Sequence, residues 1–295
     1  MEGVWECGVS CANVSKILWL ASYPKSGNTW IRAFLANYML NAERPAPINE
    51  IHKFAYGDMD VWPYEHVLGG PVDGRSVEDI YSARPEAHRF LASQQSGIVF
   101  VKTHNRLAFF RDIPTITPDV TFGAIYVIRN PLDVVISYAD HYAVTLDQAI
   151  EASGAEVHAA PARPGVIHQD IGGWSQHVLS WTSARGLYLH LVRFEDLTQD
   201  PMKAFAAIVD FLKVPRDRAK LERAIRFSSF GELAGQERKS GFIERSRHSE
   251  RFFRQGRAGG WRKSLTPEQV RKVIALHGAT MQKFGYVDAK GEPVG

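Results

Sequence analysis

The chain alternates short apolar runs of strand length with longer segments in which apolar residues recur every three or four positions. The apolar runs cover residues 17–21, 97–101, 121–128 and 187–194. The longer segments show the period of helices that bury one face. Strands that alternate with helices favour the α/β class, with a mainly parallel central sheet flanked by helices on both faces. Because no repeat or long polar linker interrupts the pattern, we predict a single domain over residues 1–295, with residues 1–15 as a loose N-terminal extension.

Capping residues indicate where several of the helices begin. Asn130 followed by Pro131 is typical of a helix start, and Thr266 with Gln269 forms a capping-box pattern. Pro85 is expected to kink or restart the helix in which it lies. The predicted helices cover 76–94, 131–142, 145–153, 172–184, 201–212, one or two segments of 216–233, and 266–285. Residues 45–74 show no clean period and are predicted to form a long irregular excursion over a pocket mouth, while 105–118 is predicted to be a loop.

The first apolar run leads into a turn that suits a bound anion. Pro24 and Gly27 prevent a strand or helix from continuing through the turn. Residues 30–38 then place apolar side chains at helical spacing, in a segment that runs to Leu40. The first amides of such a helix lack partners, and Gly27 lets an anion approach the backbone closely. The order of elements is therefore strand, P-loop-like turn and helix.

Lys25, Ser26 and Thr29 supply this turn with a positive charge and two hydroxyls, and Asn28 is a candidate helix cap. On spacing alone, phosphate binding and a turn without function are equally favoured. The order differs from the Walker pattern, because Lys25 precedes the glycine. Residues 69–76 have the Walker spacing, with arginine in the lysine position, but no convincing strand precedes them, and we interpret them as unrelated.

Composition and cysteine content are those of an ordinary globular protein. Hydrophobic residues make up 45% of the 295 residues and charged residues 23%. No apolar run approaches the roughly 20 residues that a membrane span needs, and the first residues lack the pattern of a secretory signal. We therefore predict a cytoplasmic protein without a membrane span. Cys7 and Cys11 have no nearby histidine or further cysteine to complete a zinc site, so we expect a reduced, idle pair and no metal.

Positive charge gathers in one segment near the C-terminal end. Residues 237–263 hold nine lysines and arginines against three glutamates, a net charge of +6 in a chain whose total is +3. The remainder is therefore slightly acidic, at −3. A basic segment this local suits either nucleic acid or a small, highly charged anion.

Polar side chains follow two further apolar runs. Lys102, Thr103 and His104 come directly after the second run, and Arg129 directly after the third, with Ser137 two turns into the next helix. Ligands of open parallel sheets bind beyond the carboxyl ends of the strands. His104 beside Lys102 is thus a candidate general base, and Arg129 with Ser137 could hold one phosphate group. Each of these residues taken alone is more simply read as structural.

Four segments together resemble motifs of the cytosolic-type (bacterial) sulfotransferase family, which uses 3′-phosphoadenylyl sulfate (PAPS) as donor. Residues 23–30, Tyr-Pro-Lys-Ser-Gly-Asn-Thr-Trp, are similar to the 5′-phosphosulfate loop, with asparagine where the commoner form has threonine. Residues 129–138 resemble the 3′-phosphate motif, and 102–104 the catalytic Lys-x-His. Residues 253–262 resemble the C-terminal flap. The resemblance covers most of the chain.

The resemblance implies a donor site and a catalytic group. The catalytic residues would be His104, Lys25 and Lys102. The donor-binding residues would be Lys25, Ser26, Gly27, Asn28, Thr29, Trp30, Arg129, Ser137, Ser229, Phe230, Arg254, Gln255 and Gly256, with Trp30 on the adenine. Two departures from the family pattern stand out. Gln255 replaces the usual flap lysine, with Arg257 as a candidate substitute for its charge, and Phe194 stands where many relatives have tyrosine.

The expected reaction is an in-line transfer of the sulfuryl group to a hydroxyl or amine, which leaves adenosine 3′,5′-bisphosphate (PAP). His104 would act as general base, Lys25 would stabilise the leaving phosphate, and Lys102 would hold the sulfuryl oxygens. A P-loop kinase would need a Walker lysine and a magnesium-binding carboxylate, which are not evident. A nucleic-acid module would leave residues 102–104 without a role, so we predict no nucleic-acid partner.

The acceptor and the oligomeric state are less defined by the sequence. Aromatic residues in 45–74 and 105–118 weakly favour a phenolic or otherwise apolar hydroxylated small molecule, such as a natural product. The sequence leaves the oligomeric state open, and it is compatible with a homodimer.

Overall fold

The computed structural model describes residues 15–294, and Cys7 and Cys11 lie outside the described residues. The chain divides into two compact units, each assembled from separate stretches. The first, called the sheet unit, comprises residues 15–23, 55–126 and 156–191 of the described range. The second, called the helical unit, comprises 24–54, 127–155 and 192–294. The single domain inferred from the sequence stays a prediction.

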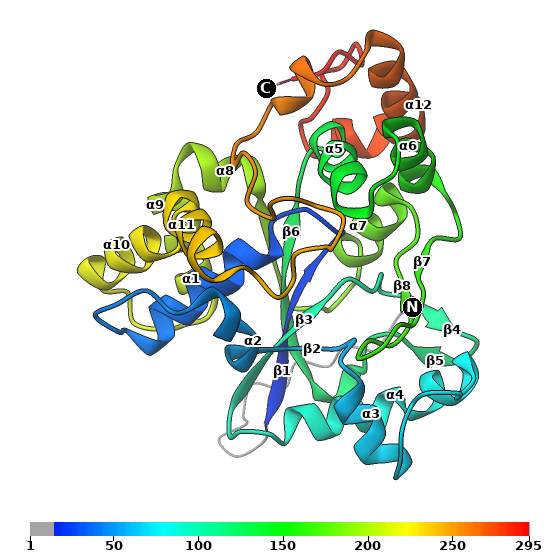
Figure 1. Cartoon of the computed structure of the whole chain (residues 1–295), viewed down its shortest axis with the longest axis vertical. Coiled ribbons are helices and arrows are strands. Elements are labelled where there is room, and N and C mark those ends of the chain that lie inside the picture. Colours follow the sequence, from blue (N-terminus) through cyan, green and yellow to red (C-terminus); the bar gives the residue numbers. More distant parts are fainter. Residues whose placement is uncertain (1–14, 295) are drawn as a thin grey trace. The chain divides into compact units, whose positions relative to one another are not determined.

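A five-stranded sheet, in the order β2-β3-β1-β6-β9, organises the sheet unit (Figure 1). Its strands are β1 (Lys16–Ser22), β2 (Ala55–Gly57), β3 (Ile98–Thr103), β6 (Thr121–Ile128) and β9 (Leu189–Arg193). The last two residues of β6 and the last two of β9 belong to the helical unit. β1 pairs in parallel with β3, from Lys16 opposite Ile98 to Ala21 opposite Thr103. β2 pairs in parallel with the other side of β3. The predicted α/β class with a parallel sheet flanked by helices is confirmed.

The central strand β1 is buried throughout its apolar run, as expected for a strand covered on both faces. Residues 17–21 are at most 1% exposed. The Trp19 indole donates a hydrogen bond to Thr121 Oγ1 at 2.9 Å, which joins β1 to β6, and its ring meets the edge of His88. The helices of this unit are α3 (Val61–Leu68), α4 (Val77–Ala92) and α7 (Trp174–Thr182). Short pairs β4 (Phe109–Phe110) with β5 (Ile113–Pro114), β7 (Ala159–Ala160) with β8 (Gln169–Asp170), and the 3-10 turn η2 (Pro118–Val120) complete it.

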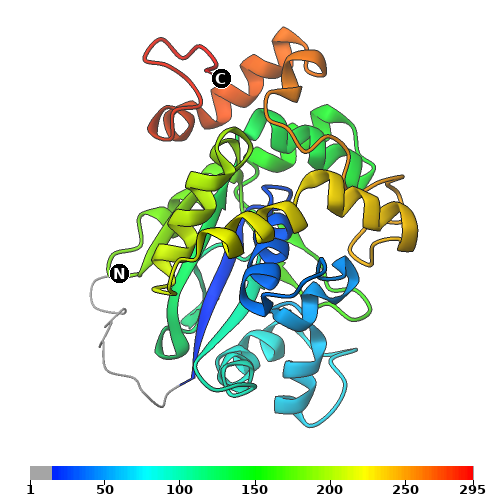
Figure 2. The ribbon, with the colours of Figure 1, turned by 90° about the vertical axis from the view of Figure 1, so that its left-hand side faces the viewer.

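The helical unit consists of helices and connecting segments. Its elements are α1 (Asn28–Leu40), η1 (Ile48–Glu50), α2 (Ile51–Phe54), α5 (Pro131–Tyr142), α6 (Leu146–Gly154), α8 (Phe194–Gln199), α9 (Pro201–Phe211), α10 (Arg218–Phe227), α11 (Phe230–Ser240), η3 (Gly260–Lys263) and α12 (Pro267–Lys283). Helix α10 packs against α1, and α12 packs against α5 and α6 (Figure 2). The segment from Gly241 to Lys263, between α11 and α12, is called the flap below.

Several predicted boundaries need correction. Residues 45–74 are not irregular, because they contain η1, α2, β2 and α3; a three-residue strand is too short to show a period. Residues 105–118 contain the β4–β5 hairpin. Helix α4 continues through Pro85 without restarting. The fourth strand ends at Arg193, and Phe194 begins α8. The predicted caps Asn130 and Thr266 are confirmed, since their side chains accept hydrogen bonds from Leu132 N and Gln269 N.

Candidate active site

The predicted anion-binding turn lies at the start of α1 in the helical unit. Gly27 is the N-cap residue, with φ of +110°, and its carbonyl accepts from Trp30 N at 3.0 Å. The prediction that Asn28 caps the helix is wrong: Asn28 is the first helical residue, and its Oδ1 accepts from Arg32 Nε at 3.1 Å. Ser26 Oγ is buried and has no hydrogen-bond partner among the described residues. An orphaned hydroxyl at a helix start suits an anionic ligand.

Gly27 is required by its surroundings as well as by its backbone conformation. A β-carbon at Gly27 would lie 2.7 Å from Cδ2 of Phe194, so the ring packs directly against the turn. The same ring supports the Arg129 guanidinium, whose carbon lies 4.2 Å from the ring centroid. Phe194, which the sequence flagged only for a missing hydroxyl, therefore packs between two predicted ligand-binding groups.

Lys25 and Arg129 are brought together in the helical unit. Arg129 Nη1 donates to the Lys25 carbonyl at 3.2 Å, and its Nη2 donates to the Arg257 carbonyl at 3.4 Å. Arg129 Nε is buried and has no partner in the described chain. Burial lowers the pKa of Arg129, but a guanidinium stays charged at neutral pH. Arg129 is thus held to the backbone of the turn and keeps one N–H group that has no partner among the described residues.

His141 is a contact of Lys25 that the sequence analysis missed. Lys25 Nζ lies 3.3 Å from His141 Nδ1 and 4.2 Å from the centroid of the Phe252 ring. His141 stands four residues after Ser137 on α5, so both belong to one helix face. That spacing from a predicted site residue was the available signal.

Further residues that the sequence predicts for the donor site take structural positions around α11 and the flap. Ser229 caps α11, with Glu232 N donating to its Oγ at 3.3 Å. Gly256 has φ of +59°, and a β-carbon there would collide with the Phe230 ring, which brings these two residues together. A β-carbon at Gly260 would lie 2.9 Å from Gln255 Oε1, so the flap folds closely on itself.

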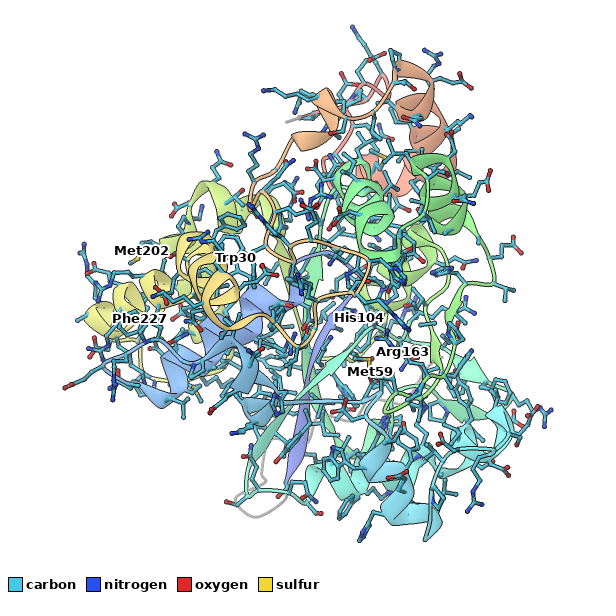
Figure 3. All side chains as sticks on the ribbon, in the orientation of Figure 1. Trp30, Met59, His104, Arg163, Met202 and Phe227 are labelled. Carbon is cyan, nitrogen blue, oxygen red and sulfur yellow. The ribbon has the colours of Figure 1, made fainter. Side chains whose placement is uncertain are left out.

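Trp30 lies in an aromatic group of the helical unit (Figure 3). Its ring meets the edges of Phe194 and Phe205, each at a centroid distance of 5.7 Å. Its Nε1 is buried with no partner in the described residues. Trp30 also packs on a cluster that contains Leu233 and Phe242, together with Phe252 and Phe253 of the flap.

Carboxylates that the sequence analysis did not single out hold the basic flap. Glu237 accepts from the backbone N–H groups of Phe252 at 2.7 Å and Phe253 at 3.0 Å. Asp133 accepts from those of Gly259 at 2.7 Å and Trp261 at 2.9 Å.

Two ion pairs add to these backbone contacts. Glu244 forms a two-pronged pair with buried Arg32, both distances being 2.7 Å. Arg254 pairs with Asp140 at 2.6 Å. The flap is thus fixed to α1, α5 and α11 by acidic groups.

The predicted base His104 directly follows β3 in the sheet unit (Figure 3). Its Nδ1 lies 2.8 Å from the Ser22 carbonyl oxygen. Because a carbonyl only accepts, Nδ1 must carry the proton, which leaves the lone pair of the neutral ring on Nε2. Nε2 is therefore the nitrogen with the proton-accepting lone pair.

His177 fixes the backbone of His104 and was also missed. His177 Nε2 lies 3.1 Å from the His104 carbonyl, and its Nδ1 lies 2.8 Å from the Tyr126 hydroxyl. Burial lowers the pKa of His177 to about 3, so the ring is neutral, donates from Nε2 and accepts from Tyr126. On α7, His177 lies on the face of Trp174 and Trp181, a position that marks it as buried. Lys102 is 9% exposed and lies in β3 opposite Leu20 and Gly57.

No helix between residues 15 and 294 is long and apolar enough to cross a membrane. Over the same residues, histidine, cysteine and acidic side chains form no group of three that could hold a metal ion.

The helical unit thus combines a glycine turn, whose Ser26 hydroxyl has no partner among the described residues, with a flap rich in positive charge. The chain belongs to the sulfotransferase domain family, whose model matches residues 15–285. The sulfotransferase class predicted from the sequence is thereby confirmed.

Individual relatives are distant and span most of the chain. Flavonol 3-sulfotransferase of Flaveria bidentis is 24% identical over 277 residues, covering 88% of this chain and 80% of its own. Cytosolic sulfotransferase 1 of Arabidopsis thaliana is 26% identical over 269 residues, covering 86% and 75%. The solved structure of retinol dehydratase in a complex with retinol and PAP has a TM-score of 0.62 at 17% identity, covering 91% and 82%. At 17% identity this likeness shows a shared fold and nothing more.

Proposed function

We propose that this protein transfers the sulfuryl group of PAPS to a hydroxyl of a small, largely apolar acceptor and releases PAP. The observation that carries the proposal is the turn at residues 24–29. There the buried Ser26 hydroxyl has no hydrogen-bond partner within residues 15–294, and it stands next to Gly27 with its positive φ. The Arg129 guanidinium donates to the backbone carbonyl of Lys25 in the same turn. An anion would satisfy these groups together.

The helical unit would hold the nucleotide. Lys25, Ser26 and the first amides of α1 would bind the 5′-phosphosulfate, together with Gly27, Asn28 and Thr29. Arg129, Ser137 and Arg254 would bind the 3′-phosphate, and Trp30 would pack on the adenine. In support, the Nε–H of Arg129 has no partner in the part of the chain that the structure describes, and the guanidinium lies on the Phe194 ring. The flap residues Gln255 and Gly256, with Ser229 and Phe230 of α11, would complete the donor site.

The sheet unit would supply the base. His104 Nε2 would take the proton of the acceptor hydroxyl as its oxygen forms the new bond to sulfur and the bond from sulfur to the leaving phosphate oxygen breaks. The proton on Nδ1, held by the Ser22 carbonyl, keeps the ring in the required tautomer. Along the chain only Tyr23 separates Ser22 from the loop that begins at Pro24.

Charge builds up on the leaving oxygen during this transfer. A fixed cation at that oxygen lowers the barrier, which is the role we propose for Lys25. Lys102 would hold the sulfuryl oxygens. When bound, PAPS supplies the activated sulfuryl group itself.

We propose a flavonol-like phenol or an apolar alcohol as acceptor. Two comparisons support this class: one relative is named for flavonol sulfation, and the structural neighbour was solved with retinol. The name of the Arabidopsis relative supports a cytosolic location. We also propose that the chain belongs with the bacterial members of the family.

Calorimetric titration with PAP tests the donor site. We expect the dissociation constant to rise at least tenfold in Lys25→Ala and in Arg129→Ala, because each loses a charge-assisted contact worth about 1.5–3 kcal/mol. Lys203→Ala, which removes the same charge from an exposed position of α9, is the control and should bind as the wild type does. Unchanged affinity in both site variants would refute the donor-site assignment.

An acceptor screen tests the transfer. Wild-type protein is incubated with PAPS and a panel of flavonols, simple phenols and apolar alcohols, and the sulfated products and PAP are measured by mass spectrometry. One mole of PAP per mole of sulfated product is expected. Release of PAP without any sulfated acceptor across the panel would contradict the proposed acceptor class.

A further inference from the structure

The sheet unit contains a buried acidic residue, Asp58, that the reaction described above does not use. Asp58 directly follows β2 and is fully buried. One oxygen of its carboxylate, Oδ2, accepts from Thr103 Oγ1 at 2.6 Å and from Asn105 Nδ2 at 2.8 Å. The other, Oδ1, accepts from Gln169 Nε2 at 3.3 Å. Two of these donors belong to the residues that flank His104.

The backbone of Asp58 holds the same segment. Its N–H donates to the Lys102 carbonyl at 3.0 Å, which continues the ladder between β2 and β3 by one residue. Asp58 therefore contacts Lys102 through its backbone, and Thr103 and Asn105 through its side chain. A single residue thus binds the chain on both sides of His104.

Other groups leave this segment little freedom. The His104 carbonyl accepts from His177 Nε2, and the Asn105 carbonyl accepts from Trp181 Nε1 at 3.1 Å. Asn105 N donates to Thr103 Oγ1 at 3.0 Å, so Thr103 accepts from one neighbour and donates to Asp58. The Thr103 hydroxyl therefore links the Asn105 backbone N–H to the Asp58 carboxylate.

Burying the charged carboxylate of Asp58 costs desolvation free energy. A buried carboxylate needs compensation, and here Arg84 Nη1 lies 3.8 Å from Oδ2. Arg84 is itself fully buried, its guanidinium carbon lies 4.8 Å from the centroid of the Tyr81 ring, and its Nε and Nη2 have no partner in the described chain. Removal of either partner alone would leave an uncompensated buried charge. In its place the carboxylate accepts hydrogen bonds from Thr103 and Asn105, the residues on either side of the predicted base.

We propose that Asp58 is a positioning residue for His104: by fixing Thr103 and Asn105 it sets the backbone from which the imidazole reaches the Ser22 carbonyl. The inference rests on the proposed function, in which His104 is the base. A misplacement of about 1 Å in a catalytic group can lower the rate about 100-fold. Loss of Asp58 should therefore act on turnover and leave donor binding unchanged.

Two variants test the role. Asp58→Asn keeps an acceptor oxygen but leaves Arg84 without a counter-charge, so the folded fraction is measured first by thermal melting. Thr103→Val has nearly the same shape and leaves the Asp58–Arg84 pair intact, while it removes the hydroxyl that links Asp58 to the chain. Thr103→Ser, which keeps that hydroxyl, is the matched control.

The first readout is turnover with and without the base. In Thr103→Val we expect kcat to fall about 10-fold or more, while the KM for PAPS stays within about twofold. The kcat of Asp58→Asn should fall as well, and the kcat of Thr103→Ser should stay within about twofold of the wild-type value. In a His104→Ala background neither variant should lower kcat further, because the group that they position is absent. Equal losses in both backgrounds would overturn the proposal.

The second readout does not depend on activity. Nitrogen-15 NMR of the His104 ring reports which nitrogen carries the proton. We expect one tautomer, protonated on Nδ1, in the wild type and in Thr103→Ser, and a mixture in Thr103→Val and Asp58→Asn. An unchanged tautomer in both variants would overturn the positioning role. A mixture in a protein without any transfer activity would retain the positioning role and refute the proposed function instead.

Discussion

Asp133 offers the sharpest test of how the flap is held. Its carboxylate, on the first turn of α5, accepts two backbone hydrogen bonds from residues more than 120 positions later, Gly259 and Trp261. Hydrogen bonds to charged groups contribute about 1.5–3 kcal/mol each. Removing both in Asp133→Ala should therefore weaken docking of residues 259–261 by at least about 3 kcal/mol, a factor of about 100 or more.

Asp133→Asn gives a smaller effect of the same sign. Its amide oxygen can accept from one N–H, whereas the NH2 group would face the other, so about half of the loss is expected. Hydrogen exchange followed by mass spectrometry on the 257–263 peptide measures the docking directly. The affinity for PAP should fall by up to the same factor, since the binding-competent flap would be less populated.

Asp210→Asn is the control, because the Asp210 carboxylate forms an exposed ion pair with Arg216 in the same unit. Its flap should exchange as slowly as that of the wild type. If the flap peptide exchanges equally slowly in Asp133→Ala and in the wild type, the two hydrogen bonds do not hold the flap, and the reasoning fails.

Two further predictions concern the loop and the dependence of stability on pH. Gly27→Ala should abolish measurable PAP binding and lower the melting temperature. The added β-carbon would lie 2.7 Å from Phe194, in a backbone conformation with positive φ. A PAP affinity equal to that of the wild type would contradict this. Burial lowers the pKa of His177 to about 3 and that of His277 to about 4. Above pH ~6.5 both histidines are neutral in the folded and in the unfolded protein. Below that pH only the unfolded protein binds the extra protons. The free energy of unfolding should therefore fall by about 1.4 kcal/mol per pH unit for each histidine, until the pH reaches its folded pKa. Denaturant unfolding at pH 7 and pH 5 measures how steeply the free energy of unfolding depends on pH. This dependence should be weaker in His277→Gln than in the wild type, and unchanged in the exposed control His52→Gln. The same pH dependence in the wild type and both variants would refute the prediction.

Local sequence patterns predicted the parts of the fold whose causes are local. Continuous apolar runs located β1 and β3, and the Asn130-Pro131 and Thr266–Gln269 patterns located two helix starts, because caps act within four residues. The strand β2 escaped prediction since three residues cannot show a period. Family motifs, not periodicity, indicated the donor turn.

The contacts that hold the candidate site join residues far apart in the chain. Asp58 meets Thr103 across 45 positions and Gln169 across 111, and Asp133 meets Trp261 across 128. No spacing rule connects such pairs, because only the folded backbone brings them together. Phe194 is a similar case. The sequence showed only that the hydroxyl of the usual tyrosine is missing, whereas the folded chain packs the Phe194 ring against Gly27 and Arg129.

The comparison of His104→Ala with the wild type tests the central claim most directly. PAP affinity and PAPS-dependent sulfation of the best acceptor are measured on the same two preparations. General-base catalysis contributes about 100- to 10,000-fold, so kcat should fall at least 100-fold while the dissociation constant for PAP stays within about twofold. Wild-type turnover in His104→Ala with a hydroxyl acceptor would contradict the assignment of His104 as the base.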